Sequence, residues 1–69
     1  MFKTFLQFAG MSAPITFEFE DRHKAKAFAG RQFYRVREVV RVITVEPDGK
    51  AALFLEKTPT GKCTERYAR

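Results

Sequence analysis

Two side chains in this chain have the soft nitrogen or sulfur donors that metal sites and nucleophilic catalysis use, His23 and Cys63. A structural zinc site needs four such ligands. Nucleophilic catalysis needs a base beside the nucleophile and a third group that orients the base. His23 stands instead among charged residues typical of a solvated helix start. We therefore expect no metal, no cofactor and no catalytic site.

The carboxylates and the glycine turns lead to the same expectation. Glu18 and Glu20 share one face of a predicted strand, a spacing that could pair two carboxyl groups for acid–base work but is more often a solvated strand face. The segment Gly61-Lys62-Cys63-Thr64 resembles the end of a phosphate-binding loop. That motif requires a glycine five residues earlier, where this chain has Glu56. The sequence predicts a protein that is not an enzyme.

The charge of the chain is concentrated in residues 22–41. Seven cations there oppose the single anion Glu38, a balance of +6, whereas the whole chain carries +5, so the other residues sum to −1. Arginine outnumbers lysine in this block, and its forked guanidinium suits phosphates and carboxylates. The predicted partner-binding residues are the block's cations and one aromatic: Arg22, Lys24, Lys26, Arg31, Tyr34, Arg35, Arg37 and Arg41.

The arrangement of this block depends on where the helix ends. On a continuous helix, Lys24, Arg31 and Arg35 fall within one narrow arc opposite the apolar side. If the chain turns to strand after Gly30, then Arg35, Arg37 and Arg41 share one face. Either arrangement places three cations in a row, which attracts a polyanion or an acidic protein surface.

The chain is rich in phenylalanine, with eight residues and no tryptophan. Phe2, Phe5 and Phe8 lie within its first eight residues. A core of this size can hardly enclose all eight rings, so some are expected to be buried against a second molecule. We predict either self-association as a homodimer or a contact with a partner through these three N-terminal rings.

Two functions fit an arginine block with surplus aromatic anchors. The first is a protein-binding module that modulates or inhibits a larger host protein assembly, since arginine and aromatic residues dominate interface hot spots. Very small proteins of this make-up are common among the products of phages and mobile elements, and that origin is expected by analogy. The alternative is sequence-nonspecific binding to an RNA or DNA backbone. The chain has no asparagine, a common base-reading residue, and no signature of a known nucleic-acid module.

The elements before the basic block are two strands. Residues 2–8 fit both a strand and a helical turn, and their phenylalanine and threonine content favours the strand. Ile15 to Glu20 alternates apolar and polar residues as a half-buried strand does. Asp21 is the predicted N-cap of a helix that ends near Gly30 or continues to about Tyr34, and we favour the longer helix.

Two or three strands follow the helix. Residues 39–46 and 51–57 are predicted strands joined by the turn Glu46-Pro47-Asp48-Gly49-Lys50, and Glu46 should face Lys50 across them. A second turn, Thr58-Pro59-Thr60-Gly61, precedes an edge strand within residues 62–67. The fold class is α+β: one domain over residues 1–69, with one helix on a mostly antiparallel sheet. The expected core residues are Phe17, Phe19, Phe28, Val42 and Leu53.

The single cysteine indicates a reducing compartment, so we expect a cytoplasmic protein. Met1 to Ala13 has a lysine, apolar residues and small residues, but Gln7 and Gly10 interrupt the apolar run that a signal peptide needs. No stretch reaches the apolar length of a membrane span, so no membrane partner is expected.

Overall fold

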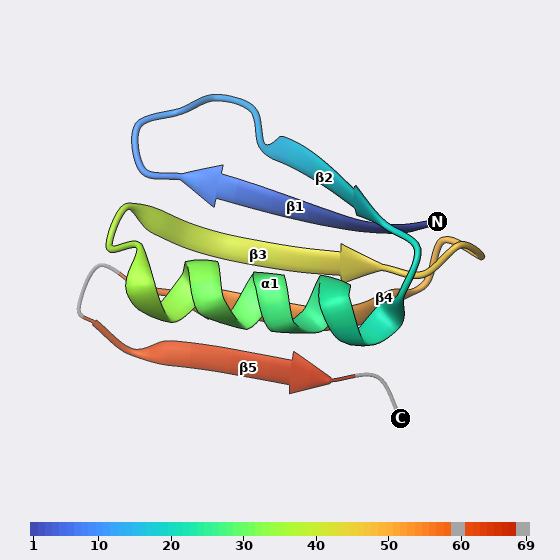
Figure 1. Ribbon diagram of the computed structural model, residues 1–69. Coiled ribbons are helices and arrows are strands. Elements are labelled where there is room, and N and C mark those ends of the chain that lie inside the picture. The colour runs from blue at the N-terminus through green and yellow to red at the C-terminus, as the bar shows by residue number, and fades with distance from the viewer. Residues whose placement is uncertain (59–60, 68–69) are drawn as a thin grey trace.

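The computed structural model describes residues 1–58 and 61–67, which form five strands and one helix. Figure 1 shows the helix lying along one face of the sheet. In chain order the elements are β1 (Phe2–Phe8), β2 (Ile15–Phe19), α1 (Arg22–Arg35), β3 (Val39–Val45), β4 (Ala51–Lys57) and β5 (Cys63–Tyr67). The predicted strand at residues 2–8, the long helix and the C-terminal edge strand are all confirmed.

The sheet has the strand order β2-β1-β3-β4-β5, and each neighbouring pair is antiparallel. The first strand of the chain therefore lies inside the sheet, between β2 and β3, and β2 and β5 are the edges. Helix α1 packs mainly on β3 and β1 and reaches β2. These two layers confirm the predicted α+β class, with one face of the sheet covered by the helix and the other open.

Helix α1 begins where the sequence places its cap. The carboxylate of Asp21 accepts a hydrogen bond from the backbone N–H of His23 at 2.7 Å. The helix passes through Gly30 and ends with Val36 as C-cap, whose N–H bonds the Gln32 carbonyl at 2.9 Å. The alternative prediction, in which the helix ends near Gly30 and a strand follows, is wrong.

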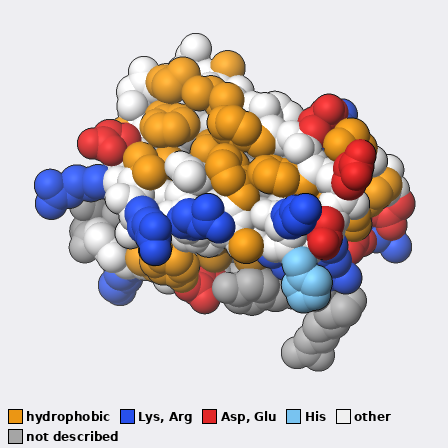
Figure 2. Space-filling model, in the orientation of Figure 1, with side chains coloured by type: hydrophobic (Ala, Val, Ile, Leu, Met, Phe, Trp, Pro, Cys, Tyr) orange, Lys and Arg blue, Asp and Glu red, His pale blue; other side chains and the backbone are white. Residues whose placement is uncertain are grey.

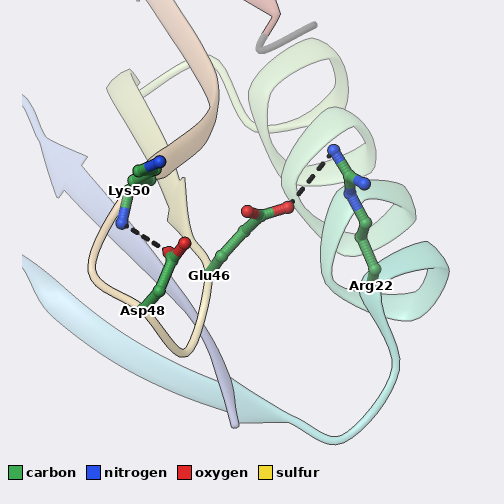
Figure 3. Close-up of polar contacts among 4 residues, drawn as sticks. All are labelled: Arg22, Glu46, Asp48 and Lys50. Carbon is green, nitrogen blue, oxygen red and sulfur yellow. Dashed lines mark hydrogen bonds and ion pairs between the residues drawn. The ribbon is translucent and has the colours of Figure 1, made fainter.

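The predicted turn between β3 and β4 forms around Gly49, whose φ of 90° is a conformation that favours glycine. The backbones of Glu46 and Lys50 meet as predicted, with the N–H of Glu46 donating to the Lys50 carbonyl at 2.8 Å. The Glu46 carboxylate reaches across to Arg22 of the helix, 3.3 Å away, and Asp48 accepts from the Lys50 N–H (Figure 3). Of the second predicted turn, Pro59 and Thr60 lie outside the described residues.

The core lies between the helix and β1, β3 and β4, and its largest side chain is Phe33, which is fully buried. Two predicted core residues, Val42 and Leu53, are buried there. Phe19 and Phe28 are only half-buried. Phe17 is 37% exposed, so its assignment to the core is wrong. The reason is that β2 is an edge strand, so the helix that seals β1 and β3 covers its apolar face only in part.

A buried polar contact joins β1 to β3 beneath the helix. The hydroxyl oxygens of Thr4 and Thr44 lie 3.0 Å apart, and both residues are fully buried. The Thr4 hydroxyl also donates to the carbonyl of Ala25 at 3.4 Å. Each buried hydroxyl is thereby satisfied within the protein, as buried polar groups require.

The three N-terminal phenylalanines do not share one face. Thr4 and Leu6 of β1 face the helix, so strand alternation places Phe5 between them on the open face. Phe2 falls on the helix-covered face, and Phe8 packs against the core cluster. All three rings are half-buried. A single surface made of all three, as the sequence-based prediction assumed, is not formed within one molecule.

Candidate interaction surface

Three of the seven cations of residues 22–41 form an exposed row on the outer side of α1. Lys24, Arg31 and Arg35 lie at spacings of seven and four residues, and all three are exposed. Residues three or four apart on a helix are neighbours on its surface. Phe28 is four residues after Lys24 and three before Arg31, so it lies next to both on the helix. Within the described part of the chain, none of the three forms an ion pair. Their charge is therefore free for a partner.

The other four cations are separated from this row. Arg22 is paired with Glu46 at the start of the helix. Arg41 lies on the open face of the sheet, because it precedes the buried Val42 in strand β3 and successive strand residues point to opposite faces. There its guanidinium pairs with the Glu56 carboxylate at 2.6 Å. Lys26 is half-buried on the far flank of the helix, and Arg37 is exposed in the turn after it. The predicted eight-residue set is thus not one continuous surface.

Tyr34, the aromatic member of the predicted set, is 59% exposed. Its ring packs edge-on against Phe33, with 5.1 Å between the ring centroids. It lies one residue before Arg35, which places it about 100° away around the helix. The ring is therefore presented beside the row of cations rather than within it.

Exposed apolar side chains adjoin the row on its other side. Ile15 and Phe17 of β2 are 40% and 37% exposed. The ring of Phe28 lies 4.8 Å from that of Phe17 and 5.1 Å from that of Phe19, measured between centroids. Phe28 therefore joins the edge strand to the helix. Figure 2 shows hydrophobic side chains gathered above a row of Lys and Arg on this face of the molecule.

We call this combination the β2–α1 surface and define it by six residues: Ile15, Phe17, Lys24, Phe28, Arg31 and Arg35. Sequence reasoning found its cations and assigned two of its apolar members, Phe17 and Phe28, to the core. The alternation of β2 shows which residues share a face, but it does not show that the strand lies at the edge. Strand order decides that, and strand order is a long-range property.

The residues with catalytic potential are not brought together. Among the described residues, no group of three or more His, Cys, Asp and Glu side chains could hold a metal ion. Cys63 is exposed at the start of β5, and the Lys3 ammonium lies 3.9 Å from the Glu18 carboxylate. Gly61 leads into strand β5 and not into a helix, unlike a phosphate-binding loop.

Comparison with known proteins identifies no relative. No protein-family model, curated protein or solved structure matches this chain. No helix in the described residues is long and apolar enough to cross a membrane.

Proposed function

We propose that this protein is a non-enzymatic binding module that uses the β2–α1 surface to dock on another protein and thereby modulates or inhibits a larger assembly. The observation that carries the proposal is that exposed apolar side chains lie beside a row of cations that forms no ion pair within the described residues. Phe28 lies in both, since it contacts Phe17 and is a helical neighbour of Lys24 and Arg31.

The apolar part of the surface favours a protein over a nucleic-acid backbone. Cations alone suffice for phosphate contacts. Exposing Ile15 and Phe17 to water is unfavourable by about 25 cal/mol for each Å² of apolar surface, and a partner that covers them recovers this free energy. Apolar anchors surrounded by charged residues are the usual anatomy of a protein–protein interface.

The surface also indicates the chemistry of its partner. A matching protein surface would bring an apolar side chain onto Ile15 and Phe17. It would bring carboxylates to the row formed by Lys24, Arg31 and Arg35, which spans three turns of the helix. Arginine binds carboxylates through two parallel hydrogen bonds, which fixes orientation as well as adding attraction. We therefore expect an acidic surface with an apolar centre.

The proposal is tested by capture from an extract of the native host, before and after nuclease treatment, with matched charge variants. The test variant is Arg31→Gln with Arg35→Gln. The control is Lys50→Gln with Lys62→Gln, which removes the same charge at exposed positions outside the surface. Glutamine is preferred to glutamate because a carboxylate at Arg35 would lie in the last helical turn, where the dipole disfavours it. Lys57 is unsuitable as a control because its ammonium lies 4.7 Å from the centre of the Phe33 ring.

A protein that is retained after nuclease, lost by the Arg31 and Arg35 variant and kept by the control supports the proposal. Phe17→Ser should also lose it, because it removes the apolar anchor. Equal loss by both charge variants would show attraction by summed charge and not by a defined site.

The alternative function, nonspecific binding to a nucleic-acid backbone, rests on the row of unpaired cations. It predicts loss of captured partners after nuclease and binding to a mixed-sequence oligonucleotide. That binding should fall log-linearly with salt, with a slope set by the phosphates neutralised. Phe17→Ser should then have little effect. The response to Phe17→Ser therefore separates the two functions.

A further inference from the structure

The open face of the sheet carries a second apolar surface. Phe5, Ile43 and Phe54 are direct cross-strand neighbours on β1, β3 and β4, and all three are half-buried. Strand alternation sets each of them opposite to the helix, because Thr4, Val42 and Leu53 on the same strands are buried beneath it. A hollow of about 380 Å³ beside this row is lined by Phe5, Gln7, Pro14, Arg41, Ile43 and Val45.

The charges on the open face are arranged differently from those on the helix. An ion pair stands on each side of the apolar row: Lys3 with Glu18 at 3.9 Å and Arg41 with Glu56 at 2.6 Å. Lys3 lies opposite Val45, two residues along β3 from Ile43. Arg41 lies two residues from Ile43 on the other side, so the two ion pairs flank the apolar row. Arg66 lies opposite Phe54 across β4 and β5 and adds one positive charge. Among the described residues, the charged side chains of this face therefore sum to +1.

We infer that the open face is the interface of a homodimer, in which a second copy of this chain packs its own open face against the first. A two-fold axis brings the same patch of each subunit together. A nearly neutral face can meet its copy without strong repulsion. The β2–α1 surface cannot, because two copies of its cation row would be opposed. Charge therefore selects the open face for self-association, and two helix-covered sheets would form a four-layer dimer.

The area available predicts a weak dimer. Five strands at about 4.8 Å spacing, with lengths of five to seven residues at about 3.3 Å each, give an open face of about 500 Å². Two such faces bury roughly 1,000 Å², the lower limit for a specific interface. We expect a dimer dissociation constant weak enough to measure, with dimers at high protein concentration and monomers on dilution.

This inference revises the predicted homodimer and is independent of the proposed function. Of Phe2, Phe5 and Phe8, only Phe5 contributes to the interface. The two helices point outward on opposite sides of the dimer, so each β2–α1 surface remains accessible. Loss of the dimer would not remove the binding site, and loss of the binding site would not dissociate the dimer.

The test is sedimentation equilibrium of the full chain from about 1 μM to about 1 mM, a range that covers dissociation constants expected of small interfaces. Ile43→Lys should raise the dimer dissociation constant at least about tenfold, because it sets two ammonium groups against each other near the two-fold axis. The matched control is Ile15→Lys. It is also an isoleucine-to-lysine substitution in a strand, but Ile15 lies on the β2–α1 surface and not on the open face. It should leave the dissociation constant unchanged.

Ile43→Thr keeps a β-branched side chain and tests the interface if the lysine variant fails to fold, which far-UV circular dichroism would reveal. It should also weaken the dimer. A wild-type chain that stays monomeric across the whole range would overturn the inference. So would a dimer that Ile15→Lys dissociates and Ile43→Thr does not, since that result would place the contact at β2.

Discussion

The buried hydroxyl pair of Thr4 and Thr44 predicts that either single substitution destabilises the protein more than the double substitution does. Thr4 donates to the Ala25 carbonyl, so the arrangement that satisfies both groups has Thr44 donate to Thr4. Thr4→Val then leaves the Thr44 hydroxyl without an acceptor, and Thr44→Val leaves Thr4 still bonded to Ala25. An unsatisfied buried group costs about 1–3 kcal/mol. We expect Thr4→Val near the upper end of that range and Thr44→Val near the lower end.

The double variant removes both hydroxyls and replaces them with methyl groups of the same shape. Replacing both partners in this way is nearly neutral or stabilising. The free energy of unfolding of the double variant should therefore lie within about 1 kcal/mol of wild type. The coupling energy is the difference between the loss of the double variant and the summed losses of the two single variants. It should therefore be about 3 kcal/mol or more, at the upper end of the range for contacting residues.

The assay is urea unfolding followed by circular dichroism for the wild type, the two single variants and the double variant. Each kcal/mol should also move the melting temperature by about 4–8 °C in a domain of this size. Thr16→Val is the control, an exposed threonine on a strand, expected within about 0.5 kcal/mol of wild type. The reasoning fails if the double variant loses as much as the two singles together.

Three further stability predictions follow from burial and backbone geometry. Phe33→Ala should cost about 3–5 kcal/mol because the ring is fully buried, whereas Phe17→Ala should cost less than half as much; equal losses in urea unfolding would contradict the assigned core. Gly30→Ala should raise the free energy of unfolding by about 0.5–1 kcal/mol, since a Cβ there meets no atom within 4 Å; a lower melting temperature would refute this. Lys57→Met should destabilise by about 1 kcal/mol, because it removes the ammonium above Phe33 and its 3.4 Å hydrogen bond to the Val36 carbonyl at the helix end; an unchanged melting temperature would contradict it.

The sequence was sufficient for local structure because local structure depends on neighbours in the chain. The Asp21 cap, the Gly49 turn and the alternation of residues 15–19 each rest on interactions within a few residues. The sequence did not reveal that Phe33, and not Phe17, fills the core. Both lie on apolar faces, and the choice between them depends on which strands the helix covers.

The basic block illustrates the same limit for the candidate site. The row of Lys24, Arg31 and Arg35 follows from helical periodicity, and the structure places all three on one exposed side. Arg41 could not be separated from them by sequence alone. Arg41 belongs to strand β3, where the next residue, Val42, is buried beneath the helix. Strand alternation therefore places Arg41 on the opposite side of the molecule from the helix. The apolar half of the β2–α1 surface was hidden for a similar reason, because its exposure results from the edge position of β2.

The central position of β1 has a consequence for how the chain reaches this fold. Its pairing with β2 closes a short loop, with Leu6 opposite Ile15, whereas its pairing with β3 joins Lys3 to Val45, 42 residues further along. During synthesis, one side of β1 stays without a partner until β3 has emerged from the ribosome. Closing such a long loop costs more entropy and slows folding. The β1–β2 hairpin should thus form early, and assembly of the sheet around it should limit the folding rate.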